Sequence, residues 1–198
     1  MLFDARRPET VDDSDPALPP GSNPERRYVE GDGFFRLAPK LSAMRDPSDD
    51  EAFMRRAIAL AAEAERDGDV PIGAVLAVGA RTFFARNEKE RRPDATAHAE
   101  ILAIRSAGAT LGAWRLAGAT LYVTKEPCVM CAGAIVAARI ARLVYGCGDP
   151  KGGAAGGAID VFASAAANHR VAITAGVLEA QTRDQLRAFF ARRRAKAE

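Results

Sequence analysis

The chain has 198 residues, of which 48% are hydrophobic, and a formal net charge of +2 at pH 7. This length and composition can bury one substantial core, so we expect one folded domain. No stretch reaches the roughly 18 apolar residues of a membrane-spanning helix, and the start of the chain lacks the apolar segment of a secretory signal. The 3 cysteines are spaced like metal ligands rather than like a disulfide framework, which predicts a reducing, cytoplasmic location.

Residues 1–47 differ in composition from the rest of the chain. They hold seven of the 11 prolines and an acidic run at residues 12–15, so we expect a disordered extension. Residues 48–198 form the expected folded domain. The extension has seven basic and nine acidic side chains, a charge of −2, which leaves +4 on the domain. A mildly basic domain is compatible with a nucleic-acid partner but does not establish one.

The first expected elements are a helix and a hairpin. Ser48 to Glu51 form a capping box, and the helix that follows reaches about Asp67. Residues 70–78 are a nearly continuous apolar run, typical of a strand buried on both faces. A turn at residues 79–81 leads into a second strand at 82–86. One face of the helix is apolar and should pack on this sheet, through Phe53, Ala57, Leu60, Ala61 and Ala64.

The second half of the domain alternates helices and strands. We expect a helix from His98 to about Ala107, a strand at 120–124, a helix from Cys128 to about Ala138 and a strand at 142–146. This alternation predicts parallel strands joined by right-handed crossovers, and ligands of such sheets bind beyond the carboxyl ends of the strands. A glycine-rich loop at 146–157 is expected to form a mobile rim. A short strand at 170–174 and a helix from Glu179 to about Ala195 follow.

Two short motifs carry the candidate chemistry: residues 98–100, His-Ala-Glu, and residues 127–131, Pro-Cys-Val-Met-Cys. Cys128 and Cys131 are three residues apart, so one helical turn can present both sulfurs to one metal. With His98 they give two thiolates and one imidazole, a set that suits zinc and leaves the fourth position for water, as in catalytic sites. A closed site would have to recruit Cys147 or His169. We therefore expect one Zn2+ per chain, bound by His98, Cys128 and Cys131.

Glu100 is the candidate catalytic residue. On a helix its side chain is turned about 200° from that of His98, so it should not bind the same ion. We expect Glu100 to take a proton from the zinc-activated water, whose pKa falls from about 16 towards about 7, and to pass it to the leaving nitrogen. Alone, Cys-x-x-Cys also occurs in redox pairs and structural zinc sites, and His-x-Glu on ordinary surfaces. Together they match the signature of zinc-dependent nucleobase deaminases.

The sequence around these motifs resembles the bacterial tRNA-specific adenosine deaminases, which make inosine at the wobble position of tRNA. The similarity runs from about residue 49 to the end of the chain. It implies an α/β fold of three layers, α/β/α, like that of cytidine deaminases, with a central mixed sheet of about five strands flanked by helices. Residues 48–198 would then form a zinc-dependent deaminase domain. The resemblance rests on residues 70–75, 96–101, 121–124, 126–134, 149–151, 153–156 and 168–171.

The same resemblance implies a substrate site, a tRNA anticodon stem-loop as partner, and a homodimer. Asn87 would hydrogen-bond the target nucleotide, Asp149 and Lys151 would contact neighbouring nucleotides or phosphates, and Asn168 would help to hold the flipped base. Phe190 corresponds to an aromatic residue beside the anticodon loop, and we expect the other member of the pair Phe189-Phe190 to be buried.

The match to the family pattern is not complete. Lys125 occupies a position that is usually apolar in the family. Trp114 falls in no motif, and we expect it to anchor packing.

The resulting prediction is hydrolytic deamination of adenosine to inosine in a tRNA anticodon loop. One alternative is a zinc-dependent deaminase of a free base or nucleoside, such as guanine, cytosine or cytidine, which needs the same metal chemistry. Another is a zinc-stabilised RNA-binding subunit without catalysis, which the presence of Glu100 argues against. Action on single-stranded DNA stays open, because single strands are bound largely by stacking and backbone contacts.

Overall fold

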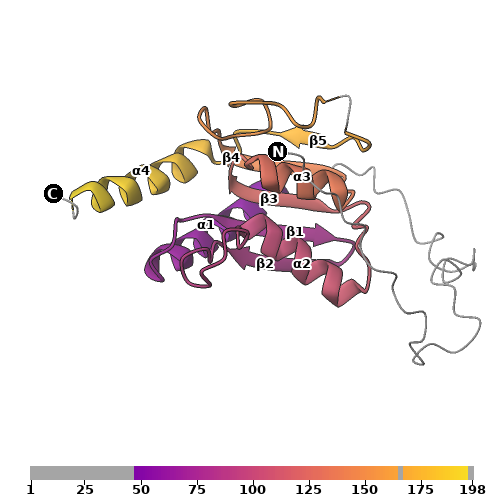
Figure 1. Ribbon diagram of the computed structural model, residues 1–198, viewed down its shortest axis with the longest axis horizontal. Coiled ribbons are helices and arrows are strands. Elements are labelled where there is room, and N and C mark those ends of the chain that lie inside the picture. Colours follow the sequence, from indigo (N-terminus) through magenta and orange to yellow (C-terminus); the bar gives the residue numbers. More distant parts are fainter. Residues whose placement is uncertain (1–46, 165–166, 196–198) are drawn as a thin grey trace, which may run out of the picture. The chain divides into compact units, whose positions relative to one another are not determined.

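The computed structural model of the protein describes residues 47–164 and 167–195 (Figure 1). The expected N-terminal extension, apart from Pro47, lies outside the described residues, so its disorder stays a prediction. None of the described helices is long and apolar enough to cross a membrane. In chain order the elements are α1 (Pro47–Arg66), β1 (Gly73–Val78), β2 (Arg81–Arg86), α2 (Ala99–Leu111), β3 (Thr120–Lys125), α3 (Val129–Ala137), β4 (Arg142–Cys147), β5 (Ala172–Thr174) and α4 (Glu179–Ala195).

The five strands form one mixed sheet, as the family resemblance implied, and their order is β2-β1-β3-β4-β5. β3, β4 and β5 are parallel, but β1 pairs antiparallel with both β2 and β3. The expected hairpin is confirmed for β1 and β2, and the expected parallel pairing is confirmed for β3 and β4. The antiparallel pairing of β1 with β3 was not part of the expectation. Because β1 runs opposite to both of its neighbours, β2 and β3 run in the same direction on either side of β1. The crossover through α2 still joins two strands of one direction.

Helices cover both faces of the sheet, which gives the three expected layers (Figure 1). Side chains alternate between the faces along β1. Ala74 and Leu76 join the core cluster under α2 and α3, whereas Val75 and Ala77 join the cluster under α1. All four are at most 2% exposed, so β1 is buried on both faces, as its apolar sequence predicted. Burying a side chain such as Leu76 contributes about 2 kcal/mol to the free energy of unfolding.

Two glycines allow helices to lie close to the sheet. A Cβ on Gly73 would come within 2.1 Å of the carbonyl oxygen of Ala57 in α1. A Cβ on Gly146, in β4, would come within 2.6 Å of the Thr182 side chain in α4. Because Gly146 has the same parity along β4 as Val144, which packs with α1, α4 lies on the α1 face.

The prediction that Trp114 anchors packing is wrong. Its side chain is 59% exposed, and its ring lies under the Arg115 guanidinium at 4.5 Å. It follows Gly112, which ends α2 in the left-handed conformation and turns the chain away from the core. The buried residue of this connection is Leu116, which is 1% exposed.

Candidate active site

The three predicted metal ligands lie where two helices begin. His98 is the N-cap residue of α2 and Cys128 is the N-cap residue of α3, and Cys131 lies in the first turn of α3. Each N-cap carbonyl accepts the first hydrogen bond of its helix, from Leu102 and Ala132 respectively. Since α3 follows the carboxyl end of β3, the group lies at the edge of the sheet where ligands of α/β proteins bind. Helix N-termini also favour negatively charged thiolates.

The geometry of the group fits a tetrahedral zinc ion. The two sulfurs are 3.7 Å apart, and the Nδ1 of His98 lies 3.7 Å from the sulfur of Cys128 and 3.5 Å from that of Cys131. Zinc bonded to sulfur at about 2.3 Å and to nitrogen at about 2.0 Å would separate its tetrahedral ligands by roughly 3.5 to 3.8 Å. The three residues are therefore positioned to bind a metal ion.

The two other candidate ligands are engaged elsewhere. The thiol of Cys147 contacts the carbonyl oxygen of Thr124 at 3.6 Å, and the Nε2 of His169 contacts the carbonyl oxygen of Ile140 at 2.7 Å. Neither belongs to the ligand group found among the described residues. With these three ligands alone, a bound metal would keep a fourth coordination position for water or substrate, as in catalytic sites.

Mutual hydrogen bonding makes the two thiols of the group unequal. Hydrogen bonds from Cys131 and then from His98 lower the pKa of Cys128 to about 3. The same bond to Cys128, and then burial, raise the pKa of Cys131. The hydrogen bond with Cys128 also raises the pKa of His98. Binding a metal through both sulfurs would require both thiols to lose their protons.

Glu100 lies in the first turn of α2, two residues after His98, and is only 4% exposed. Its Oε2 is buried and has no hydrogen-bond partner among the described residues. Burial is the main cause that raises the pKa of this carboxyl. A buried polar atom without a partner costs free energy, so the site holds an acceptor for a group that the protein itself does not supply. A carboxyl with a raised pKa is suited to exchange protons near neutral pH.

The structure brings Asn87, Asp149 and Lys151 to the same edge of the sheet as the metal ligands. Asn87 follows the end of β2, and its neighbour Glu88 donates its N–H to the carbonyl oxygen of Ala97, next to His98. Asp149 and Lys151 follow the end of β4.

The unusual Lys125 has a partner in this loop. It forms an ion pair with Asp149, whose other carboxylate oxygen accepts the N–H of Lys151 at 3.1 Å. The residue that departs from the family pattern therefore contacts a predicted substrate residue directly.

Glu126, which the sequence did not single out for a role, organises the loop after β4. Its carboxylate accepts backbone N–H groups from Asp149, Ala155 and Gly157, each at 2.8 Å. A Cβ on Gly153 would lie 2.3 Å from this carboxylate, which explains the glycine there. The loop is thus folded around one buried side chain, and its mobility stays a prediction. The sequence did contain a signal for this role, because Glu126 is an acidic residue directly before Pro127 and Cys128 to which no other role was assigned.

Asn168 is not brought to the metal group within this chain. Its Oδ1 and its carbonyl oxygen accept hydrogen bonds from Arg139 at 2.6 and 2.7 Å. Arg139 follows the C-terminal end of α3, whereas Cys128 precedes its N-terminal end. The 9 residues of α3 span about 13 Å at 1.5 Å per residue. Asn168 therefore connects α3 to the segment before β5 and does not lie beside the metal ligands.

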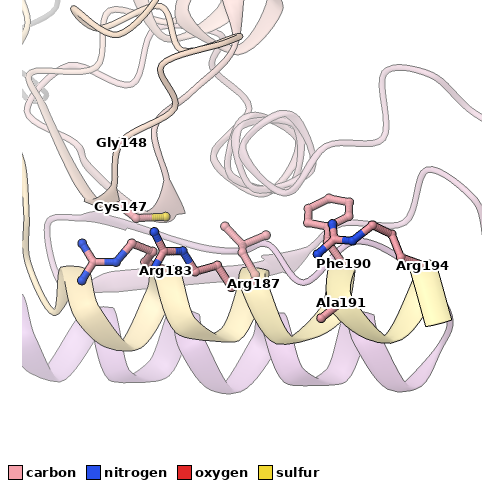
Figure 2. A pocket seen from close by; sticks show the side chains of 8 residues that line it. Cys147, Gly148, Arg183, Arg187, Phe190, Ala191 and Arg194 are labelled. Carbon is pink, nitrogen blue, oxygen red and sulfur yellow. The ribbon is translucent and has the colours of Figure 1, made fainter.

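Phe190 borders a groove of about 580 Å3 between α4 and the end of β4 (Figure 2). Phe190 is 43% exposed and packs edge to face on Phe189, which is 6% exposed, so one member of the pair is buried, as expected. Arginines line the groove from one side of α4, and Gly148, directly before the Asp149 loop, lines the other side. These arginines are Arg183, Arg187 and Arg194.

Comparisons of sequence find similar proteins over most of the described chain. The sequence model of a family described as MafB19-like deaminase matches residues 48–183. A tRNA-specific adenosine deaminase of Bacillus subtilis (strain 168) is 46% identical over 148 residues, which cover 74% of this chain and 92% of that protein. One from Haemophilus influenzae is 45% identical over 147 residues, 73% of this chain and 85% of that protein.

Comparisons of structure agree. A chain solved in a study of A-to-I editing by tRNA:A34 deaminases at the wobble position of transfer RNA superposes with a TM-score of 0.65 at 44% identity. The match covers 68% of this chain and 99% of that one. A guanine deaminase from Nitrosomonas europaea matches with a TM-score of 0.60 over 71% of this chain and 84% of its own, but at 23% identity this likeness concerns the fold alone. The deaminase fold expected from the sequence is confirmed.

Proposed function

Since this chain belongs to the family of the tRNA-specific adenosine deaminases, we propose that it hydrolyses the adenosine at the wobble position of a tRNA anticodon loop to inosine. The oxygen of a water molecule forms a bond to C6 of the base, the bond from C6 to the exocyclic nitrogen breaks, and the nitrogen leaves as ammonia. No oxidant or reductant is needed, because adenosine and water balance inosine and ammonia.

The observation that carries the proposal is the unpartnered carboxylate oxygen of Glu100 beside a three-ligand group. We assign Glu100 the movement of protons: it accepts one from the attacking water and delivers protons to N1 and then to the leaving amine. The carboxyl is buried, and burial raises its pKa. Such a group exchanges protons near neutral pH more readily than an ordinary carboxylate.

We propose zinc as the metal, one ion per chain, held by His98, Cys128 and Cys131. The donor set of two sulfurs and one nitrogen and the 3.5 to 3.7 Å separations of these atoms support this choice. When bound in such a site, zinc lowers the pKa of a coordinated water to about 7.

The groove beside α4 supports RNA as the partner. The groove beside α4 presents the guanidinium groups of Arg187 and Arg194, together with Arg183, which pairs with Glu179, and the exposed ring of Phe190 lies at its edge. Cations that follow a phosphate backbone, combined with an aromatic surface for stacking, are typical of single-stranded nucleic-acid sites. We assign this groove to the RNA next to the target adenosine, with Asn87, Asp149 and Lys151 contacting the target and its neighbours. Asn168, held by Arg139, would act by supporting the chain near β5.

Three further assignments accompany the proposal. Free thiols in the ligand group require a reducing compartment, which supports the cytoplasm. A homodimer rests on the family resemblance and is tested by light scattering. Action on single-stranded DNA is tested by offering the deoxyribose version of the RNA substrate.

The decisive experiment is an inosine assay with zinc-loaded protein. The substrates are an anticodon stem-loop with a wobble adenosine and, separately, free adenosine, cytidine, cytosine and guanine. Inosine in the stem-loop alone is the expected result. Turnover of a free base or nucleoside alone would overturn the RNA assignment while leaving the metal chemistry in place. No turnover of any substrate by zinc-loaded protein would favour the non-catalytic RNA-binding subunit.

A further inference from the structure

Asp69 is an acidic side chain with no surface exposure that has no part in the metal group. It lies between α1 and β1, and its carboxylate accepts three hydrogen bonds. Its Oδ1 accepts the side-chain N–H of Asn87 at 2.7 Å, and its Oδ2 accepts the backbone N–H groups of Glu90 and Arg91 at 3.1 and 3.2 Å. A buried carboxylate is costly unless it is hydrogen-bonded, so these three donors explain why it is tolerated there. They also join Asp69 to the chain that follows β2.

The contact fixes which way the amide of Asn87 faces. A carboxylate only accepts hydrogen bonds, whereas an amide side chain has one end that donates and one that accepts. The Nδ2 of Asn87 must therefore face Asp69, and its Oδ1 must face away from it. This Oδ1 takes no hydrogen bond among the described residues, although Asn87 is 4% exposed. The hydrogen bond from the Glu88 N–H to the Ala97 carbonyl oxygen places Asn87 beside the segment that carries His98.

We propose that Asp69 is a positioning residue that orients Asn87 so that its amide oxygen, and not its amide nitrogen, faces the bound nucleotide. The amide oxygen of Asn87 then favours a nucleotide that carries a hydrogen-bond donor at this position. The target nucleotide offers such a donor in the exocyclic amine of adenine and in the 2′-hydroxyl of ribose. This inference rests on the proposed function, because it assigns the orientation of a residue in the same site.

The test is Asp69→Asn. In this variant the side-chain amide oxygen at position 69 must accept the N–H groups of Glu90 and Arg91. The side-chain amide nitrogen at position 69 therefore faces Asn87. Two nitrogen donors would then meet, and Asn87 is expected to turn its amide over and present nitrogen to the nucleotide. We expect kcat/KM on the anticodon stem-loop to fall roughly tenfold to a hundredfold, mainly through KM, as when a buried hydrogen-bond pairing is lost.

The matched control is Asp67→Asn. Asp67 lies two residues before Asp69 and pairs with Arg86 and Arg91, but it does not contact Asn87. This substitution removes the same charge from the same turn, and we expect kcat/KM within about twofold of wild type. An Asp69→Asn variant that behaves like this control would overturn the proposal, because a purely structural role for Asp69 is largely met by the remaining amide oxygen.

A reciprocal exchange separates orientation from loss of packing. In Asp69→Asn with Asn87→Asp, the amide nitrogen at position 69 donates to the carboxylate at position 87, and an oxygen again faces the nucleotide. We expect the double variant to recover at least tenfold in kcat/KM over the Asp69→Asn single variant. No recovery, with the double variant folded, would contradict the assigned orientation.

One readout does not depend on the substrate at all. The side-chain NH2 of Asn87, assigned by its absence in Asn87→Asp, should exchange slowly with water in wild type and faster in Asp69→Asn, as measured by nitrogen-15 NMR. If wild type makes no inosine in the stem-loop, the proposed function is wrong. The exchange rates still test the orientation of Asn87 independently of that result. Equal exchange rates in the two proteins would overturn the orientation of Asn87.

A substrate with 2′-deoxyadenosine at the wobble position identifies the donor. If the 2′-hydroxyl donates to Asn87, the loss caused by Asp69→Asn shrinks on the deoxy substrate. If the exocyclic amine donates, the loss is the same on both substrates. Either pattern supports the proposal, whereas no loss on either substrate would contradict it.

Discussion

Lys125 and Asp149 form an ion pair across the carboxyl ends of β3 and β4, between a residue that departs from the family pattern and a predicted substrate contact. Both side chains are partly buried, with 28% and 17% of their surfaces exposed. Burial alone would raise the pKa of Asp149, but the hydrogen bonds from Lys125 and from the N–H of Lys151 outweigh it and hold this pKa below its usual value.

Because its pKa is lowered in the folded protein, Asp149 contributes stability above the pKa that it has when unfolded, about 4. This contribution is lost as the pH falls through the lower folded pKa. We expect Lys125→Met to reduce the free energy of unfolding by up to about 1 kcal/mol at pH 7, and by progressively less as the pH is lowered and Asp149 becomes protonated. Urea unfolding of wild type and variant over a series of pH values measures the difference. Arg55→Met, which breaks the exposed pair with Glu51, is the control and should cost less at pH 7.

The glycine-rich loop should lose stability when Glu126 is replaced. Glu126→Gln places an amide nitrogen against some of the three backbone N–H donors from Asp149, Ala155 and Gly157. We expect unfolding to become easier by about 1 to 3 kcal/mol and deaminase activity to fall, while bound zinc is retained.

Two glycine variants test whether the loop geometry is responsible. Gly153→Ala should reproduce the loss, since its Cβ would lie 2.3 Å from the Glu126 carboxylate. Gly133→Ala, on the exposed side of α3 with nothing within 4 Å, should be neutral or stabilising by up to about 1 kcal/mol. Full activity in Glu126→Gln and Gly153→Ala, measured by inosine formation, would show that the loop does not need this anchor.

The sequence was sufficient for features that depend on local periodicity and spacing. The apolar run of β1 predicted a strand buried on both faces because its neighbours on both sides are apolar. The spacing of Cys128 and Cys131 predicted that their sulfurs lie close enough to share a metal, and the structure places them 3.7 Å apart. The direction of β1 relative to β3 could not be read in this way, because a helix between two strands does not determine which strands pair.

Long-range pairings were also hidden from the sequence. Asp69 lies 18 residues from Asn87, and Lys125 lies 24 residues from Asp149. No periodic pattern links residues at such distances along the chain. Trp114 was misjudged for a related reason, because its large apolar side chain suggested burial whereas the turn after Gly112 exposes it.

Removal of the Glu100 carboxylate should separate metal binding from turnover. In Glu100→Ala we expect one zinc per chain, because the carboxylate is not in the ligand group, and a fall in kcat of about a hundredfold to ten-thousandfold, the usual range for loss of a proton-transferring side chain. Metal content by mass spectrometry and single-turnover inosine assays test both parts. Loss of the zinc together with activity would instead make Glu100 a ligand.

The ligand set makes a different prediction for each cysteine. Cys147→Ser should keep one zinc per chain, since the Cys147 thiol contacts the Thr124 carbonyl and lies outside the group. Cys131→Ser should lose most of the metal, because a hydroxyl is a poor substitute for a thiolate on zinc. Chelation of wild type should abolish activity, and added zinc should restore it. A Cys147→Ser protein without metal would show that the site closes with a fourth protein ligand.

The arginine groove should determine how binding depends on salt. Arg187 lines the groove on α4, and replacing it by alanine should weaken binding of the anticodon stem-loop and reduce the slope of log K against log salt by about 0.7, the value for one phosphate contact on a single strand. Anisotropy titrations with the Glu100→Ala background, between 50 and 200 mM salt as is usual for such slopes, measure this without turnover. Arg81→Ala is the control, because Arg81 is exposed at the start of β2, and β2 ends at the edge where Asn87 and the metal ligands lie. An equal loss of slope in both variants would show that RNA binds through general charge, whereas a loss in Arg187→Ala alone places a phosphate beside α4.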